Sequence, residues 1–165
     1  MKEIIKDISI YASYALGAYT LMLITGYALQ DFCSRRISNK RELEMEVKKE
    51  AEIQGVKNPI IIDFAERNSP RYKKMRGPRA SISAYNRDTR KLVPFKDAET
   101  SEGIFPINIL HVREGSECNT GMVKHEIYHL KHHLPGPRNK ILNGLKYFFY
   151  EEPSAILYAL RHMRN

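Results

Sequence analysis

Two histidines and a glutamate lie close together in the segment His125-Glu126-Ile127-Tyr128-His129, which has the spacing H-E-x-x-H. Residues four apart on an α-helix share one face, so the imidazoles of His125 and His129 can bind the same metal ion. Glu126 then points toward the water on that metal and can accept its proton. The segment therefore predicts a helix that carries two protein ligands of a catalytic zinc site.

A catalytic zinc site needs a third protein ligand, because such sites combine three protein ligands with one water. The longer pattern H-E-x-x-H-x-x-G-x-x-H is excluded, because His132 stands where its glycine belongs and Pro135 where its last histidine belongs. Glu151 and Glu152 follow twenty-odd residues after the motif, which leaves room for a turn and a connecting helix. Either carboxylate could complete the site, and a helix N-terminus stabilised by negative charge is the structural alternative for both.

The region from about residue 105 to 163 resembles the gluzincin metallopeptidases, particularly the compact minigluzincin-like forms, through its H-E-x-x-H motif and later glutamate. The third ligand of that family often stands in the pattern Glu-x-x-Ala. Glu152 with Ala155 matches this pattern and Glu151 does not, so the resemblance implies Glu152 as the ligand and leaves Glu151 as the alternative. The implied site is a Zn²⁺ ion with one catalytic base and three metal ligands: Glu126, His125, His129 and Glu152.

The chain has 165 residues and a formal net charge of +8 at pH 7. Its length beyond the apolar N-terminal stretch suits one domain with its own core and is too short for two. The two cysteines, Cys33 and Cys118, form neither a disulfide framework nor a C-x-x-C motif, which fits a reducing compartment. Cys118 precedes the expected metal helix, so its thiolate could cap the zinc; a small buried residue is the simpler interpretation.

Basic residues are concentrated between positions 67 and 79, where no acidic residue occurs. The stretch could attract anionic lipid or nucleic acid, or it could be a solvated loop, which its prolines and glycine favour. No zinc finger, glycine-rich phosphate loop or RNA-binding signature accompanies it, so we expect no specific nucleic-acid partner. The stretch contains Arg67, Arg71, Lys73, Lys74, Arg76 and Arg79.

The N-terminal segment from Ile8 to Leu29 carries no charged residue. As a helix these residues would extend about 33 Å, which is enough to cross the core of a bilayer. Tyr11 and Tyr27 lie near its two ends, where interfacial aromatic residues are common. A signal peptide would have a shorter apolar core and a cleavage site after it. A buried helix of a soluble protein is the other alternative, and we expect a membrane anchor.

Basic residues flank both ends of this segment, with more of them after it than before it. Lys2 and Lys6 precede the segment, whereas Arg35, Arg36, Lys40 and Arg41 follow it. The more positive side of a membrane helix faces the cytoplasm, which predicts a single-pass protein with a cytoplasmic C-terminal domain. We therefore divide the chain into an anchor with its flanks, residues 1–36, and a catalytic domain, residues 37–165.

The remaining residues of the sequence predict a few strands followed by several helices, which is typical of an α+β fold. Asn39 and Glu42 have the spacing of a helix N-cap and its partner, and Gly55 offers the end of that helix. Residues 87–103 are expected as a loop or hairpin. Strands are expected at residues 59–64, 80–85 and 104–112.

The third expected strand has Pro106 near its start, which predicts an edge position because proline cannot donate to a ladder. An open edge beside the metal helix could hold an extended substrate by backbone pairing. Asn119 or Thr120 can cap the metal helix. Further helices are expected over residues 141–149 and 153–163. Together with the family resemblance, this implies a small zincin-like domain, in which a short sheet packs on the H-E-x-x-H helix and C-terminal helices follow.

The sequence does not decide the roles of several other polar residues. His132 lies one turn beyond it and could be a fourth ligand, but that would close the catalytic position; an exposed helix end is the alternative. Peptide hydrolysis also benefits from a donor for the oxyanion that develops in the transition state. The candidate donors are Tyr147, Tyr150 and His162.

These features predict a membrane-anchored zinc-dependent metallopeptidase that hydrolyses peptide bonds with a zinc-activated water and a glutamate base. Its expected partners are a peptide or protein substrate and membrane lipid. Two other classes of function stay open: a non-catalytic membrane-anchored module that binds zinc for structure, and a module that binds lipid or nucleic acid through the basic stretch. The pattern makes no prediction of oligomeric state.

Overall fold

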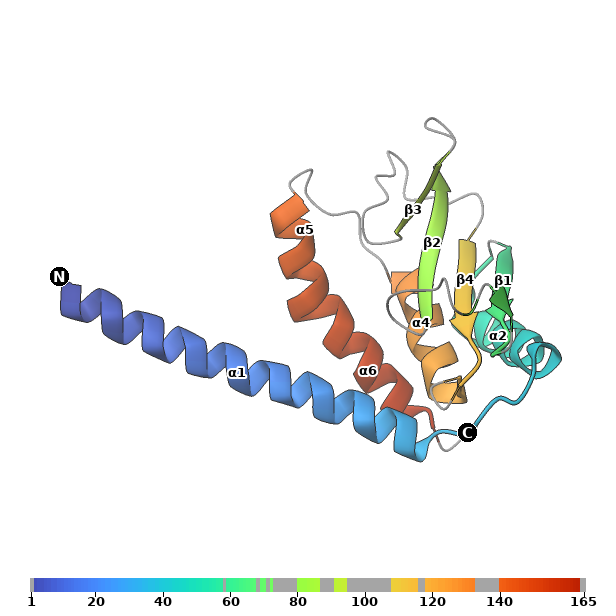
Figure 1. Cartoon of the computed structure of the whole chain (residues 1–165), viewed down its shortest axis with the longest axis horizontal. Helices are drawn as coiled ribbons and strands as arrows, with labels where there is room; N and C mark the ends of the chain where they lie inside the picture. Colours follow the sequence, from blue (N-terminus) through green and yellow to red (C-terminus); the bar gives the residue numbers. More distant parts are fainter. Residues whose placement is uncertain are drawn as a thin grey trace.

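The computed structural model describes residues 2–57, 59–67, 69–70, 72, 80–86, 91–94, 108–115, 118–132 and 140–163. Figure 1 shows a long N-terminal helix, a small sheet with helices against it, and a C-terminal helical rod. The mixture of strands and helices confirms the expected α+β class. Apart from Arg67, the basic residues of the 67–79 stretch lie outside the described part of the chain, as do Pro106 and Pro135.

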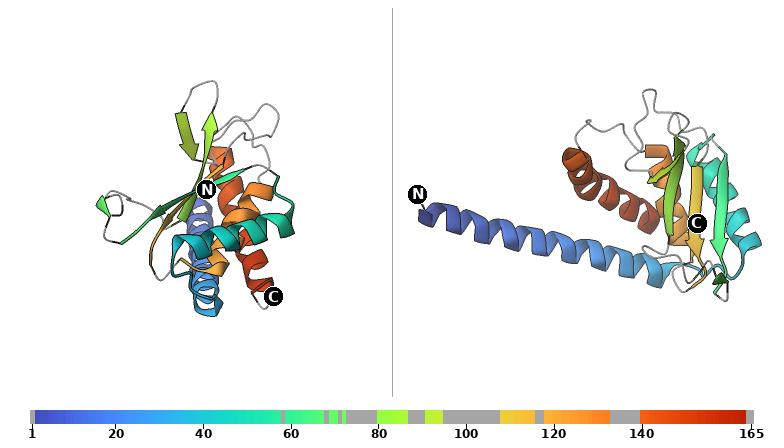
Figure 2. Two further views of the ribbon diagram at one scale, coloured as in Figure 1. Left: turned by 90° about the vertical axis from the view of Figure 1, so that its right-hand side faces the viewer. Right: turned by 45° about the horizontal axis from the view of Figure 1, so that its top comes forward.

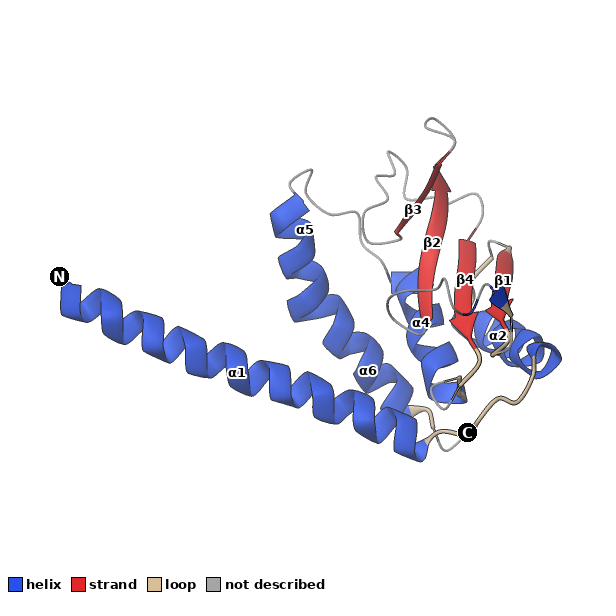
Figure 3. Cartoon of the chain, viewed as in Figure 1, coloured by secondary structure: helices blue, strands red, loops and turns tan. Residues whose placement is uncertain are grey.

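Four strands form one mixed sheet in the order β1-β4-β2-β3, drawn in red in Figure 3. The strands β1 and β4 run parallel, and Asp63 lies directly beside His111 in their register. The pairs β2–β4 and β2–β3 are antiparallel. The bounds of the strands are β1 Ile60–Ala65, β2 Ala80–Asn86, β3 Lys91–Pro94 and β4 Asn108–Arg113.

The predicted edge position of the strand near Pro106 is wrong. Strand β4 lies inside the sheet, with β1 on one side and β2 on the other. It begins at Asn108, so every residue of the strand has a backbone N–H and can pair on both sides. Of residues 87–103, which are expected as a loop or hairpin, the structure describes 91–94, which form β3 and pair antiparallel with β2.

The core lies between the sheet and two helices, α2 (Lys40–Gln54) and α4 (Thr120–His132); Figure 2 shows both helices beside the strands. In β4 the residues alternate between buried and half-buried, so one face of the sheet packs inward. The fully buried residues at the centre of this core include Leu43, Leu110, Val112, Val123 and Ile127.

Helix α2 begins and ends where the pattern predicts. The side chain of Asn39 accepts a hydrogen bond from the backbone N–H of Glu42, with a distance of 2.9 Å. Gly55 ends the helix with φ of 68°, a left-handed conformation that glycine adopts without steric cost. These caps position α2 so that its apolar stripe faces α4 and the sheet.

Helix α1 (Lys2–Cys33) is the longest element of the fold. Its segment Ser9–Cys33 has a mean hydropathy of 1.2, and by length and composition it could cross a membrane. Most of it is exposed, but Leu23 and Gln30 are buried where the last turns of α1 lie against α4 and α6. The close approach needs Gly26, since a Cβ there would lie 2.8 Å from Cγ2 of Ile156.

The C-terminal residues form one continuous rod rather than the two separate helices that the sequence predicts (Figure 1). The rod consists of α5 (Lys140–Lys146), the π-helical segment η2 (Tyr147–Glu151) and α6 (Glu152–Arg161). Pro153 lies at the N-terminal end of α6. It occupies the first turn after a widened π turn, where its missing N–H breaks fewer regular hydrogen bonds.

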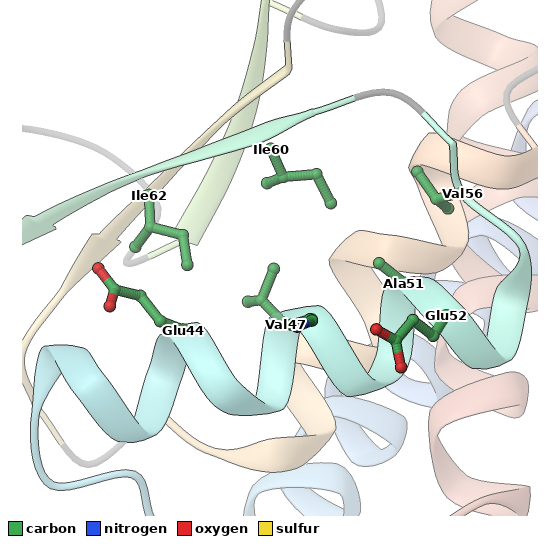
Figure 4. Close-up of a pocket in the computed structure, with 8 residues that line it drawn as sticks. Glu44, Val47, Ala51, Glu52, Val56, Ile60 and Ile62 are labelled. Carbon is green, nitrogen blue, oxygen red and sulfur yellow. The ribbon is translucent and has the colours of Figure 1, made fainter.

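A groove of about 400 Å³ lies between α2 and the edge strand β1 (Figure 4). Its floor is apolar, with Val47, Ala51, Ile60 and Ile62 among the lining residues, and charged residues of α2 stand at its rim. None of the residues of the H-E-x-x-H motif lines this groove, so it is separate from the candidate site.

Candidate metal centre

The helix of the motif, α4, is fixed at its start by Asn119. The side-chain oxygen of Asn119 accepts a hydrogen bond from the N–H of Met122 at 2.8 Å, which is the expected N-cap. Its amide nitrogen also donates to Asp31 of α1 at 2.8 Å. One residue thus caps α4 and ties that helix to the end of the N-terminal helix.

Helix α4 directs the two motif histidines away from the core and toward the C-terminal rod. His125 and His129 are both buried, and their Nε2 atoms lie 3.1 Å apart. Glu152, the first residue of α6, reaches both of them. Its Oε2 lies 3.4 Å from Nε2 of His125, and its Oε1 lies 3.7 Å from Nε2 of His129.

These three side chains have the spacing that a zinc ion requires. Ligand atoms at about 2.0–2.1 Å from a tetrahedral zinc ion lie about 3.3 Å from one another. One ligand atom from each of His125, His129 and Glu152 lies within 4.8 Å of the others. Two imidazole nitrogens and one carboxylate oxygen are also a common ligand set of catalytic zinc. The residues present therefore fit Zn²⁺.

The π-helical segment explains how Glu152 reaches the site together with a tyrosine. The backbone N–H of Glu152 donates to the carbonyl of Tyr147, five residues earlier. Because this turn contains an extra residue, residues five apart come to lie one above the other. The Tyr147 ring stacks on His129 at 5.1 Å between centroids, and its hydroxyl lies 3.5 Å from His129 Nε2.

A second tyrosine reaches the site from the N-terminal helix. The hydroxyl of Tyr27 donates a hydrogen bond to Oε2 of Glu152. Its ring lies beside that of His125, with 5.4 Å between the centroids. The buried Nδ1 of His125 has no hydrogen-bond partner among the described residues, so packing against Tyr27 helps to orient this imidazole.

The surroundings shift the pKa values of Glu126 and Glu152 in opposite directions. Burial raises the pKa of Glu126 to about 7, against an opposing effect of the charge of His125 and with a smaller increase from the charge of Glu152. Burial also acts to raise the pKa of Glu152, but hydrogen bonds and charges from His125 and His129 outweigh it, and the pKa falls to about 2. Glu152 is therefore an anion in the pH range where Glu126 can exchange a proton.

The other acidic candidate, Glu151, does not join the cluster in the structure. Its Oε1 lies 3.2 Å from Nζ of Lys146. Helix geometry separates adjacent residues by about 100°, so Glu151 and Glu152 cannot both face the histidines. The structure thus brings Glu152 to the motif histidines, as the Glu-x-x-Ala pattern implies.

The remaining sequence candidates lie elsewhere in the fold. His132 is exposed, and its ring stacks on Tyr128 at 4.2 Å. Cys118 is buried in the apolar core, where burial raises the pKa of its thiol to about 11. Tyr150 is 60 % exposed, and His162 stacks on Tyr158 at the end of α6. Of the three candidate oxyanion donors, only Tyr147 contacts the site.

A buried polar network connects the helices that carry the site, and the sequence did not predict it. Glu50 of α2 is 1 % exposed and lies 3.4 Å from Nζ of the buried Lys124, which directly precedes His125. Tyr158 of α6 donates to Glu50 at 2.8 Å, and Gln54 donates to it at 2.7 Å. The network connects α2, α4 and α6, the helix that begins with Glu152.

A hollow of about 260 Å³ reaches the site from the side of α4 and the rod. Its lining includes His129, so the hollow could admit a ligand to the metal position. The other lining residues are Tyr128, Lys131, His132, Tyr150, Glu151 and Ser154.

Comparison of the chain with protein-family models, with curated proteins and with solved structures finds no match. The geometry of the site and the chemistry of its residues are therefore the basis for a functional assignment.

Proposed function

We propose that this protein is a membrane-anchored, zinc-dependent metallopeptidase of the gluzincin type, with a zincin-like domain. The observation that carries the proposal is the convergence of His125, His129 and Glu152, whose ligand atoms lie within 4.8 Å of one another. Two of these residues come from one helix and the third from another, so the convergence is a property of the fold. It agrees with the ligand set expected from the motif and the later glutamate.

Zinc bound by these residues would supply a Lewis acid that makes water nucleophilic near neutral pH and polarises a peptide carbonyl. Glu126 follows the first ligand and is the base that accepts the proton of the attacking water. Its raised pKa, about 7, suits a group that must also return this proton to the leaving amine. The hydroxyl of Tyr147 lies 3.5 Å from Nε2 of His129, and it can stabilise the oxyanion.

The coordination favours a catalytic role over a structural one. Structural zinc sites are closed by four protein ligands, whereas catalytic sites keep one position open. Within the described part of the chain, the metal cluster contains only His125, His129 and Glu152. Cys118 and His132, which could have closed the site, point to the core and to the surface.

The membrane assignment depends on α1. Its segment Ser9–Cys33 is long and apolar enough to cross a bilayer. Only 6 % of its most apolar stretch of residues is buried. A core helix of a soluble protein would be mostly buried. More basic residues follow this apolar segment than precede it, so we place the sheet and the metal centre on the cytoplasmic side.

The test is zinc stoichiometry together with peptide cleavage, measured on the full chain in detergent. We expect one zinc per chain in the wild type, and loss of both zinc and cleavage in His129→Ala and Glu152→Ala. Glu151→Ala is the matched control, because it removes the neighbouring carboxylate that lies outside the cluster. It should keep its zinc.

The base is tested separately with Glu126→Gln. This variant should bind zinc normally and lose roughly 10²- to 10⁴-fold in turnover, the usual contribution of a general base. Full turnover in Glu126→Gln would disprove the assigned base, and zinc retention in both His129→Ala and Glu152→Ala would disprove the metal centre.

A further inference from the structure

The second half of α1 is docked on the rest of the fold along one side of the helix. Figure 1 shows this half beside the C-terminal rod, while the first half projects away from the other described elements. The docked residues follow the three- and four-residue spacing of a single helix face. This docked face consists of Tyr19, Leu23, Gly26, Tyr27, Gln30 and Asp31.

The docked face reaches the middle of the apolar segment of α1. As a helix, the uncharged segment from Ile8 to Leu29 places Tyr19 about 15 Å from either end. The Tyr19 hydroxyl donates to the carbonyl of Phe148 at 2.5 Å, and its ring lies 5.1 Å from that of Phe148 and 5.0 Å from that of Phe149. The π segment η2 is therefore level with the middle of the segment that would cross a bilayer.

The residues around η2 are unsuited to that depth in a bilayer. Lys146 precedes η2 and Glu151 ends it, and Nζ of the one lies 3.2 Å from Oε1 of the other. If α1 crossed a bilayer while docked, this ion pair would lie among the acyl chains, where ionised side chains are costly. The docked position of α1 and a position across the bilayer therefore exclude each other.

The domain does not need α1 to hold its own core together. The main apolar core of the described residues lies between α2, α4 and the sheet and contains no residue of α1. The chain just after α1 is also tied down separately. The N–H of Ile37 donates to the carbonyl of Cys118 at 2.9 Å, and the N–H of Thr120 donates to the carbonyl of Arg35 at 3.0 Å. A hinge between Cys33 and Arg35 would thus let α1 leave while the sheet, α2 and α4 stay in place.

We propose that α1 alternates between the docked position and a position across the bilayer, and that only the docked position completes the metal centre. When α1 is docked, Tyr27 donates to Glu152 and packs on His125. When α1 crosses the bilayer, Tyr27 leaves both residues. Because coupling between two equilibria is reciprocal, crossing weakens zinc binding and zinc binding favours docking. The inference rests on the anchor and the metal centre of the proposed function and adds regulation of that centre by the membrane.

A disulfide can hold α1 in the docked position. A Cβ at Gly26 would lie 3.9 Å from the Cβ of Ile156, and disulfides join Cβ atoms about 3.5–4.5 Å apart. Gly26→Cys with Ile156→Cys should therefore cross-link on oxidation, and the reduced form of the same chain is its control. Gly17→Cys with Ile156→Cys should not cross-link, because no atom lies within 4 Å of a Cβ at Gly17. Both carry Cys33→Ser to remove the exposed native thiol.

The first measurement asks whether docking prevents crossing. The full chain, with a tag at each end, is oxidised in detergent and reconstituted into phosphatidylcholine vesicles, and protease is added outside. Only chains whose C-terminal tag is labelled from outside are counted. We expect the N-terminal tag to be protected in the reduced form and digested in the oxidised form. A protected tag in the oxidised form would overturn the exclusion, and a digested tag in the reduced form would disprove the anchor and the switch together.

The second measurement asks whether docking strengthens the metal centre. In the same vesicles, competition with a chelator should show zinc bound about 10-fold more weakly by the reduced form than by the oxidised form, the effect expected from loss of a ligand's partner. Equal affinities would overturn the coupling. Absence of zinc from both forms would disprove the metal centre and with it the coupling, whereas tag protection decides the exclusion without zinc.

A variant without a disulfide tests the same switch from the opposite side. Gly26→Ala places a Cβ 2.8 Å from Cγ2 of Ile156 and so disfavours docking. A larger fraction of its chains than of Gly17→Ala chains should protect the N-terminal tag. Equal protection in the two variants would contradict a competition between docking and crossing.

Discussion

The hydroxyl of Tyr27 donates a hydrogen bond to the carboxylate of Glu152. Tyr27 belongs to the apolar helix α1, and Glu152 is the proposed third metal ligand on α6. The helix that would anchor the protein thus contacts the site itself. Partners of metal ligands hold the ligands in orientation and tune their affinity. We therefore regard α1 as part of the site, in addition to its role as an anchor.

Replacement of Tyr27 by phenylalanine should weaken zinc binding by about 10-fold, toward the lower end of the effect of such partners. The ring that packs on His125 stays, while the hydrogen bond to Glu152 is lost. Competition with a chelator measures the affinity. Tyr14→Phe is the control, because Tyr14 is 74 % exposed on the same helix. Equal affinities of the two variants would show that the Tyr27 hydroxyl contributes nothing to the site.

Replacement of Gly26 by alanine should separate α1 from α6 and weaken zinc binding further. The added Cβ would lie 2.8 Å from Cγ2 of Ile156, a branched side chain near the backbone that cannot simply rotate away. Gly17→Ala adds the same methyl group where no atom lies within 4 Å and should have no effect. The double variant Gly26→Ala with Ile156→Ala should regain part of the affinity. Identical zinc titrations for Gly26→Ala and Gly17→Ala would contradict this packing.

Replacement of Glu50 by glutamine should lower the free energy of unfolding by about 3 kcal/mol, because it leaves the buried Lys124 without its counter-charge. The pair connects α2 to α4, with 1 % of the Glu50 side chain and 6 % of the Lys124 side chain exposed. Lys124→Met together with Glu50→Gln should recover much of the loss, since no buried charge then remains unpaired. Urea denaturation in detergent measures the effect, with Lys131→Met, at an exposed position of α4, as the control. Additive losses in the double variant would exclude a direct coupling of the two charges.

The raised pKa of Glu126 predicts how the metal-free protein depends on pH. The folded state holds this proton up to about pH 7, whereas a glutamate ordinarily loses it at 4.5. Folding therefore binds a proton between these values, and the contribution of Glu126 to stability is present below 4.5 and lost as the pH rises through 7. Glu126→Gln should match the wild type at acidic pH and melt at a higher temperature at alkaline pH. A constant difference in melting temperature across the pH range would show that Glu126 titrates normally.

The elements that depend on local pattern were predictable from the residues alone. The caps of α2 at Asn39 and Gly55 and the N-cap of α4 at Asn119 involve partners a few residues away. The shared face of His125 and His129 follows from the period of the α-helix. The apolar length of α1 likewise follows from composition. In each case the interaction acts over one or two turns, so sequence spacing is enough to specify it.

Other features were decided only by the tertiary structure. The π turn that aligns Tyr147 with Glu152, the central position of β4, and the pairing of Glu50 with Lys124 have no signal in sequence spacing. The sequence suggested an interfacial position for Tyr27, but gave no sign that its hydroxyl donates to Glu152, far along the chain.

The physical reason is that each of these contacts joins elements whose separation in space depends on how several helices and strands pack at once. The residues by themselves specified which chemistry was available: two imidazoles on one helix face, carboxylates downstream and an apolar span before them. Packing specified which carboxylate reaches the imidazoles and which side chains hold it there.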